Sequence, residues 1–161
     1  ELLMIVDLER NDLGKVALIG SVRVESLFRT ELYRSLIHLV SDVSAEIDDE
    51  TSTTSVLQAL LPGGSITGAP KQRAIEILQQ LEETPRGVYT GCIGYIRPGR
   101  AEFNIAIRTI VHQNSVYHVH AGGGIVADSS PEAEYEEMLL KASNMFRALG
   151  LSEDKIACLH H

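Results

Sequence analysis

Cysteine is scarce in this chain of 161 residues, and its scarcity excludes two kinds of scaffold. The two cysteines, Cys92 and Cys158, are too few to build a disulfide framework or a zinc site. Because disulfide-rich proteins belong to oxidising compartments, a chain without such a framework is expected in the reducing cytoplasm.

Long apolar runs and nucleotide fingerprints are missing as well. No stretch approaches the roughly 20 apolar residues that a membrane-spanning helix needs. No charged and apolar leader precedes a small-residue cleavage site, so we do not expect secretion. Neither GxGxxG nor GxxxxGKS/T occurs. The remaining composition, 44% hydrophobic and 22% charged, is typical of a soluble globular domain.

Positive charge is also in short supply. Lys and Arg total 14 against 22 Asp and Glu, which gives a formal net charge of −8. This balance argues against nucleic acid and against an anionic membrane as the main partner. It leaves room for an anionic metabolite if basic side chains, backbone amides or a metal gather at one place.

The order of predicted elements favours an α+β fold with antiparallel sheet over a repeating βαβ fold. Helical patterns occupy residues 1–12, 55–61, 70–81 and 131–149. Strand patterns occupy residues 22–30, 33–47, 88–96, 102–112 and 115–121, and residues 125–127 continue the last of these.

The ends of the chain also lead to expectations. We assign residues 1–150 to one domain and residues 151–161 to a tail. Glu1 begins directly in a helical pattern without a methionine or a cap, so we expect a piece of a longer protein. The final two histidines are either native or the remnant of a tag.

A glycine-rich loop, PGGSITGAPK at residues 62–71, precedes one of the predicted helices. Its glycines permit close approach of a ligand to the backbone, and they are Gly63, Gly64 and Gly68. The amides that open the helix at residues 69–71 suit an anion, and Ser65 and Thr67 add hydroxyl groups. The alternative is a plain turn followed by a capped helix.

A second glycine-rich feature, Gly122–Gly124, interrupts the last strand pattern. Three successive glycines weaken a strand, so they indicate a place where side chains are excluded. Either a ligand presses against this backbone, or the strand bends or bulges there.

Arg108 lies in the strand-like segment FNIAIRTI. Strand alternation places Asn104, Ala106 and Arg108 on one face. If that face is covered, Arg108 is a candidate for bidentate binding of a carboxylate. If the face is open to water, Arg108 is an ordinary surface residue.

Carboxylates and histidines supply the remaining candidates. Glu137 and Lys141 have i,i+4 spacing, so Glu137 is either a partner in a solvated ion pair or a ligand for a hard cation such as Mg²⁺, with Glu1 as a second carboxylate. His38, in an apolar strand, is either a hydrogen-bonded core residue or a catalyst. His118 and His120 alternate on one strand, but a third metal ligand is not evident.

Six segments, taken in order, carry a resemblance to a known family. They are ELLMIVDLERNDLGKV, HLVSDV, LPGGSITGAPKQRAIEIL, RGVYTGCIGYI, NIAIRTI and HAGGGIVADSSPEAEYEEMLLKA. Together they resemble the chorismate-binding enzymes, which include anthranilate synthase component I, aminodeoxychorismate synthase component I, isochorismate synthase and salicylate synthase. The match runs from Glu1 to about Leu149, and six segments in one order are far more specific than any one of them.

This resemblance implies a fold and a set of site residues. The fold would be part of the chorismate-enzyme architecture, with antiparallel β-sheets packed together and helices outside. Mg²⁺ would be held by Glu1 and Glu137, with Glu134 close by, and His38 would assist loss or replacement of a ring hydroxyl. The residues that would contact the substrate are Tyr89, Arg108, Gly122, Gly123, Gly124, Ser65, Thr67, Gly68 and Ala69.

The resemblance also implies an activity. The loop PGGSITGAPK with NIAIRT and GYI favours the aminodeoxychorismate branch, in which chorismate and ammonia give 4-amino-4-deoxychorismate for 4-aminobenzoate and folate. A glutamine amidotransferase subunit or domain would supply the ammonia. Anthranilate synthase component I is the alternative within the family, and a non-catalytic small-anion binding module is the alternative outside enzymes. Because the family's N-terminal half, with its PIKGT segment, is not in this chain, we expect the chain alone to be inactive and its open sheet edges to favour a homodimer.

Overall fold

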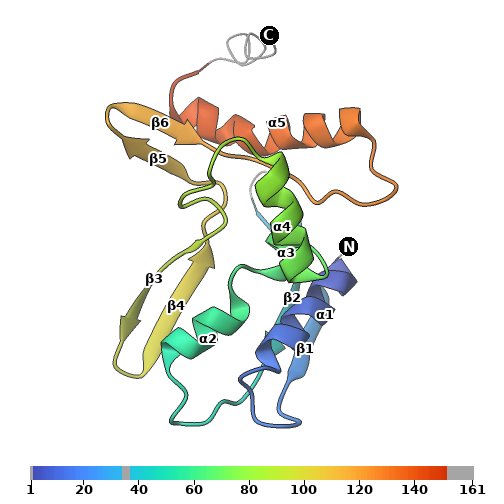
Figure 1. Ribbon diagram of the computed structural model, residues 1–161, viewed down its shortest axis with the longest axis vertical. Helices are drawn as coiled ribbons and strands as arrows, with labels where there is room; N and C mark the ends of the chain where they lie inside the picture. Colours follow the sequence, from blue (N-terminus) through green and yellow to red (C-terminus); the bar gives the residue numbers. More distant parts are fainter. Residues whose placement is uncertain (1, 34–36, 152–161) are drawn as a thin grey trace. The chain divides into compact units, whose positions relative to one another are not determined.

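The computed structural model describes residues 2–33 and 37–151, and the chain divides into two compact units, Glu1–Glu83 and Thr84–His161 (Figure 1). Among the described residues, the first unit combines helices with one hairpin, and the second combines two hairpins with one long helix. Helices and antiparallel two-stranded sheets in one chain confirm the α+β prediction.

A helix and a long hairpin form the first part of unit one. Helix α1 spans Leu2–Leu13, close to the predicted 1–12. Strands β1 (Arg23–Leu32) and β2 (Ile37–Ser44) pair antiparallel, with register shifts in the first half of β1. An isolated bridge between Ala17 and Ile47 links the segments that flank this hairpin. Both strands follow the predicted β-branched and apolar runs.

Three helices complete unit one: α2 (Thr53–Leu60), α3 (Gly64–Thr67) and α4 (Lys71–Leu81). Ser52 caps α2, because its hydroxyl accepts a hydrogen bond from the amide of Ser55 at 3.1 Å.

The predicted loop at residues 62–71 needs two corrections. It contains the short helix α3, in which the amide of Gly68 donates to the carbonyl of Gly64 at 2.9 Å. Pro70 is at the N-cap of α4 and not in its first turn, because its ψ of 133° is extended and not helical. The helix therefore begins one residue later than the proline pattern predicts.

Two hairpins form the sheet part of unit two. Strands β3 (Cys92–Arg97) and β4 (Arg100–Ile105) pair antiparallel, as do β5 (Ile110–Gln113) and β6 (Val116–Val119). The second hairpin turns through two residues with positive φ, 50° and 62°, which is the backbone that a two-residue hairpin loop requires; they are Asn114 and Ser115.

Helix α5 (Pro131–Ala148) matches its prediction closely. The hydroxyl of Ser130 accepts from the amide of Ala133 at 3.3 Å, Pro131 occupies the first turn, and Gly150 ends the helix with a φ of 75°. The helix buries Ala142 and Met145, which lie three residues apart and so on one face.

Three strand predictions in unit two are wrong in part. Residues 88–91 form a turn, in which the amide of Gly91 donates to the carbonyl of Val88 at 3.0 Å. The segment 102–112 is broken between β4 and β5, where Arg108 has a φ of 51°, so alternation ends at Ile105. Residues 120–127 carry no strand in the part of the chain that the structure describes.

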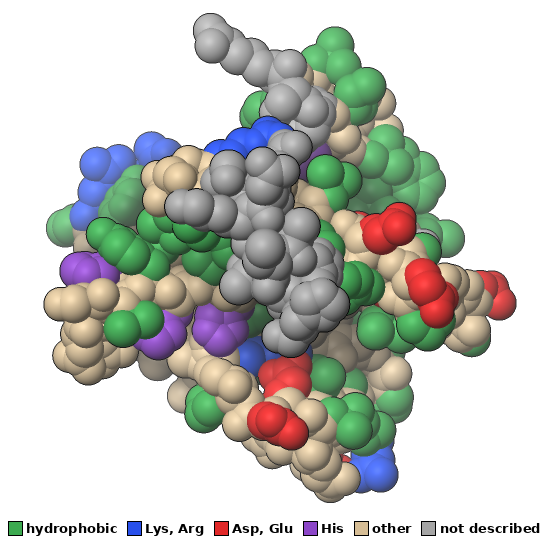
Figure 2. Space-filling model, turned by 90° about the horizontal axis from the view of Figure 1, so that it is seen from above, with side chains coloured by type: hydrophobic (Ala, Val, Ile, Leu, Met, Phe, Trp, Pro, Cys, Tyr) green, Lys and Arg blue, Asp and Glu red, His purple; other side chains and the backbone are tan. Residues whose placement is uncertain are grey.

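Apolar side chains remain exposed on both units. The buried apolar residues among those described are few: Val6, Ala106, Ala142 and Met145. Large exposed ones occur on every hairpin; examples are Leu32, Ile37, Leu39, Ile93, Ile96 and Tyr117. Apolar side chains are visible at several places on the face shown in Figure 2. Two-stranded hairpins of this kind are marginal without a further layer to pack against. Across the described residues, none of the helices combines the length and apolar character of a membrane span.

Candidate functional site

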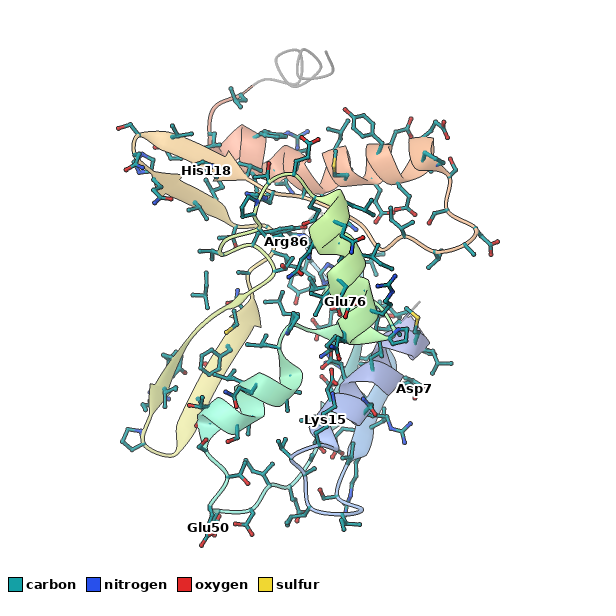
Figure 3. All side chains as sticks on the ribbon, in the orientation of Figure 1. Asp7, Lys15, Glu50, Glu76, Arg86 and His118 are labelled. Atoms are coloured by element: carbon teal, nitrogen blue, oxygen red, sulfur yellow. The ribbon has the colours of Figure 1, made fainter. Side chains whose placement is uncertain are left out.

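The turn before β3 presents Tyr89 in a cluster of polar and aromatic groups. Its ring stacks on His120 with centroids 5.2 Å apart and planes at 22°, and the guanidinium carbon of Arg86 lies 5.9 Å from its centroid. Arg86 lies between α4 and β3 along the chain (Figure 3). Such cation–π and stacking contacts restrict the orientation of a phenol ring.

Backbone hydrogen bonds hold this turn to the segment after β4. The amide of Thr90 donates to the carbonyl of Ala106 at 3.0 Å, and the amide of Ala106 donates to the carbonyl of Gly91 at 2.9 Å. Ala106 is fully buried and Thr90 nearly so. Tyr89 is thus fixed to one of the few buried points of unit two.

The glycine triplet lies between Tyr89 and α5. A Cβ built on Gly122 would be 3.2 Å from the Tyr89 hydroxyl, and one built on Gly123 would be 2.9 Å from Oε2 of Glu134. The same Cβ would be 3.9 Å from Oε1 of Glu137. The structure therefore brings together Tyr89, two glycines of the triplet and the two carboxylates of α5, all of them named from the sequence.

Both carboxylates have partners nearby in sequence, one just before α5 and one within it. The Ser129 hydroxyl donates to Oε1 of Glu134 at 2.5 Å, and the ammonium of Lys141 lies 2.5 Å from Oε1 of Glu137. The Glu137–Lys141 pair has the i,i+4 spacing that the sequence analysis gives for a solvated ion pair. The glutamate side chain is about half exposed, so the pair contributes little stability. One oxygen of Glu137 remains outside this pair.

The donor set suits a hard divalent cation. Two carboxylates approach Gly123, where Mg²⁺ would find the carboxylate oxygen that it prefers. The Lys141 ammonium lies at the same place, 3.8 Å from a Cβ built on Gly123, so a bound Mg²⁺ would have to displace it from Glu137. Among the described residues, no group of three His, Cys, Asp or Glu side chains converges as a complete metal site. The remaining predicted ligand, Glu1, lies outside the described residues.

Arg108 and the histidines occupy other places. Arg108 follows the end of β4 in an exposed, left-handed conformation, two residues after the buried Ala106. His38 lies in β2 of unit one, opposite Glu31, and its ring centroid is 5.4 Å from that of Tyr33. His118 is exposed on β6 (Figure 3), whereas His120 lies beyond the end of that strand, so the two do not form a metal-binding pair on one strand.

The glycine-rich loop of unit one packs on α1. A Cβ on Gly64 would lie 2.7 Å from the Cβ of Leu8, and Gly68 has a φ of 95° that favours glycine. Thr67 donates its hydroxyl to the carbonyls of Gly63 at 3.2 Å and Gly68 at 3.4 Å. These features account for Gly64, Thr67 and Gly68 within the fold, and Ser65 and Ala69 remain exposed.

A buried charge cluster beside this loop was not predicted. Asp12, near the end of α1, is 2% exposed, and its two oxygens accept from Lys15 at 2.6 Å and from Lys71 at 2.5 Å. Burial by itself would raise the pKa of Asp12, but the hydrogen bonds from the two lysines outweigh it and lower the pKa. No local pattern links Asp12 to Lys71, since 59 residues separate them.

Glu9 lies one turn before Asp12 on the same helix. Burial raises the pKa of its carboxyl, and the Asp12 carboxylate raises it further. Lys71 and a hydrogen bond from the Gly64 backbone oppose that rise.

The contacts of Arg86 and His120 with Tyr89 were not predicted either. No sequence pattern indicates them, because they depend on how the turn before β3 and the end of β6 meet.

The sequence has known relatives over nearly its whole length. The sequence profile described as chorismate binding enzyme matches residues 1–147. Anthranilate synthase component 1 of Aquifex aeolicus is 47% identical over 155 residues, which is 96% of this chain and 31% of that protein. Aminodeoxychorismate synthase component 1 of Bacillus subtilis is 47% identical over 156 residues, which is 96% of this chain and 33% of that protein.

Solved structures give the same result. The crystal structure of anthranilate synthase component I from Streptococcus pneumoniae has a TM-score of 0.83 at 42% identity, covering 89% of this chain and 33% of that one. A putative 2,3-dihydroxybenzoate-specific isochorismate synthase from Bacillus anthracis has a TM-score of 0.82 at 28% identity, covering 93% and 40%. The chain spans about a third of the length of its curated relatives. It belongs to the chorismate binding enzyme family.

Proposed function

We propose that this chain forms the chorismate-binding part of an aminodeoxychorismate synthase component I. One observation carries the proposal: Tyr89 lies beside Gly122, and the carboxylates Glu134 and Glu137 lie beside Gly123, in unit two. Chorismate has two carboxylates and ring hydroxyl chemistry, which call for a cation, hydroxyl and amide donors and an acid–base group.

Each residue has a role in this proposal that follows from its chemistry. Bound Mg²⁺, held by Glu137 with Glu134 and Glu1, would neutralise a substrate carboxylate and orient the ring. Tyr89 would donate its hydroxyl to a substrate oxygen, with the ring held in place by His120 and Arg86.

The backbone and the remaining side chains would complete the binding of the substrate. The glycine triplet would offer amide donors with no side chain to keep the substrate away, and Arg108 would pair with a second carboxylate. His38 would move a proton to the departing ring hydroxyl. Four loop residues would line the opposite side of the ring: Ser65, Thr67, Gly68 and Ala69.

Binding of chorismate tests the metal and substrate site. Calorimetric titration of chorismate in the presence of Mg²⁺ should give an affinity at least about tenfold lower for Glu137→Gln than for the parent chain, because one charged ligand is lost. Glu136→Gln, one residue earlier and exposed, is the matched control and should bind as the parent does. Equal affinities for the two variants would contradict the proposal.

The aminodeoxychorismate branch is proposed on the loop PGGSITGAPK and the segments NIAIRT and GYI. Relatives named for each branch are equally similar, at 47% identity, so the anthranilate branch is the competing assignment. Ammonia would come from a glutamine amidotransferase, and the product would be 4-amino-4-deoxychorismate.

Two chimaeras separate the branches. In each, this chain replaces the matched third of a relative, either the Bacillus subtilis or the Aquifex aeolicus protein. With chorismate, ammonium and Mg²⁺, mass spectrometry should find higher retained activity in the aminodeoxychorismate host. Higher retained activity in the anthranilate host would favour the other branch.

We further propose that the chain alone does not turn over and that the remaining part of a full-length enzyme completes it. The exposed apolar hairpins and the coverage of about a third of each relative support this proposal. Sustained turnover by the purified chain would contradict it.

The open edges of β1–β2 and β3–β4 also favour a homodimer of the isolated chain. Light scattering that finds only monomer would contradict the dimer.

The compartment belongs to the same proposal. The low number of cysteines, two in the whole chain, supports a reducing cytoplasm. Oxidised, disulfide-linked protein isolated from cells would contradict this location.

A further inference from the structure

The most deeply buried charged group among the described residues lies outside the site proposed above. Asp12 is 2% exposed and both of its carboxylate oxygens are paired. Its two partners differ in where they come from. Lys15 lies three residues further along the chain, just past the end of α1, and its side chain is 53% exposed, whereas Lys71 comes from α4 and is 19% exposed.

Lys71 is the residue at which the glycine-rich loop ends. It is the first residue of α4, and it follows directly after Pro70. At the other end of the loop, Gly64 packs so closely on Leu8 of α1 that a Cβ would be 2.7 Å from the Leu8 Cβ. The loop is therefore attached to α1 at both ends, once by packing and once by an ion pair.

Glu9 lies between these two attachments. It accepts a hydrogen bond from the backbone of Gly64 and lies near both Asp12 and Lys71. Glu9 therefore lies next to the Asp12 carboxylate and the Lys71 ammonium, on the part of α1 that contacts the loop. Side chains of α1 thus contact the loop at its start, through Gly64, and at its end, through Lys71.

We infer that Asp12 is a positioning residue that holds the glycine-rich loop, residues 62–71, in place through Lys71. The inference rests on the proposed function for what the loop contacts, since Ser65, Thr67, Gly68 and Ala69 are its proposed substrate-facing residues. A buried carboxylate that loses a cationic partner is destabilised, so the Asp12–Lys71 pair resists separation of the loop from α1. Lys15 cannot hold the loop on α1, because it lies three residues after Asp12 and is not part of the loop.

A pair of matched variants tests the inference. Lys71→Met and Lys15→Met each remove one ammonium from the same carboxylate, but only the first removes a link to the loop. Hydrogen exchange is followed at two loop amides that are bonded within α3, those of Ile66 and Gly68. Exchange should be at least about tenfold faster in Lys71→Met, as for a local opening, and change less than about twofold in Lys15→Met.

Two further variants distinguish loss of the ion pair from general misfolding of Lys71→Met. Lys71→Arg keeps the cation and should restore slow exchange, which a purely volume-dependent effect would not do. Asp12→Asn removes the charge at the other end of the pair and should speed exchange at the same two amides. Similar exchange in Lys71→Met and Lys15→Met, or loop exchange that Asp12→Asn leaves unchanged, would overturn the inference.

Chorismate binding separates this inference from the proposed function. If the loop lines the substrate, Lys71→Met should also weaken chorismate binding, with Lys71→Arg restoring it and Lys15→Met having no effect. Faster loop exchange with unchanged chorismate affinity would support the role of Asp12 and contradict the role of the loop in binding. Unchanged loop exchange would contradict the role of Asp12 whatever the affinity.

Discussion

Gly64 in the first unit and Gly123 in the second are both crowded, but by different kinds of atom. A Cβ at Gly64 would lie 2.7 Å from the Cβ of Leu8, a carbon fixed to helix α1. A Cβ at Gly123 would lie 2.9 Å from Oε2 of Glu134, the far end of a flexible side chain. Gly64 is therefore required by packing within the protein, whereas the crowding at Gly123 can relax.

The charged groups beside these glycines differ in the same way. The Asp12 side chain is 3% exposed between two lysines, whereas that of Glu137 is 52% exposed in its pair with Lys141. A buried pair resists loss of either partner, while an exposed pair is weak and exchanges partners easily. Two similar combinations of glycine and charge thus differ in burial: the carboxylate beside Gly64 is buried, and the one beside Gly123 is half exposed.

The largest expected effect is on Asp12. Asp12→Asn should lower the free energy of unfolding by about 3 kcal/mol near neutral pH, because two lysines lose a buried carboxylate. Asp7→Asn, an exposed residue of the same helix paired with Arg10, should change it by less than about 0.5 kcal/mol. Urea unfolding followed by circular dichroism measures both, and equal losses would remove the distinction between buried and exposed pairs.

The pH dependence of the Asp12 effect has a definite sign. Because the pKa of Asp12 is lowered in the folded protein, its stabilisation is present above the ordinary pKa of aspartate. It is lost as the pH falls through the lowered folded value. The difference between the parent chain and Asp12→Asn should therefore shrink below about pH 4.

Gly64→Ala should have the next largest effect. The added methyl meets a fixed carbon of α1, so we expect a loss of about 2 kcal/mol in the free energy of unfolding. Ser65→Ala, an exposed neighbour in α3, is the control for general effects on this short helix. A loss no greater than that of Ser65→Ala would show that α1 and α3 can move apart freely.

Glu9→Gln should stabilise the chain slightly near neutral pH. The pKa of Glu9 is raised in the folded protein, so this carboxyl favours folding only at low pH and opposes it once the pH exceeds the raised value. Glutamine keeps an oxygen for the Gly64 backbone, and the gain should be below about 1 kcal/mol. Unfolding measured from about pH 7 to about pH 4 should show the gain disappear; a gain that persists at low pH would contradict the cause.

Gly123→Ala should have the smallest effect on stability and a clear effect on binding. The Glu134 carboxylate can move aside, so we expect a change below about 0.5 kcal/mol in the free energy of unfolding. The methyl would occupy space between the carboxylates and the backbone, so Mg²⁺-dependent chorismate binding should weaken. A stability loss as large as that of Gly64→Ala would show that packing within the protein requires both glycines.

Features set by neighbouring residues in sequence were predictable. Ser130, Pro131 and Gly150 delimit α5 because caps, first-turn prolines and left-handed glycines act locally. Apolar and β-branched runs located the strands of the first hairpin, and β3 and β6 in part, whereas β4 and β5 were predicted as one strand over 102–112. The proximity of Tyr89, the glycine triplet and the α5 carboxylates followed from resemblance to a family, and not from spacing.

Features set by distant contacts were not predictable. The Asp12–Lys71 pair joins two helices separated by 59 residues, and no period or motif links them. Arg108 interrupts a segment that has the sequence pattern of one strand, because its backbone is left-handed. Arginine rarely adopts this conformation, so the residue type does not predict the break. His120 is a possible metal ligand by its residue type, but in the structure it stacks on Tyr89, a contact that depends on where β6 ends.

Manganese broadening of amide resonances tests the central claim most directly. Mn²⁺ occupies sites of the kind that bind Mg²⁺, and it broadens nearby NMR signals. The account predicts that a small amount of Mn²⁺ broadens the amides of Gly122–Gly124 first, and that Glu137→Gln abolishes the effect while Glu136→Gln does not. Broadening elsewhere with the triplet unaffected, or identical broadening in both variants, would contradict it.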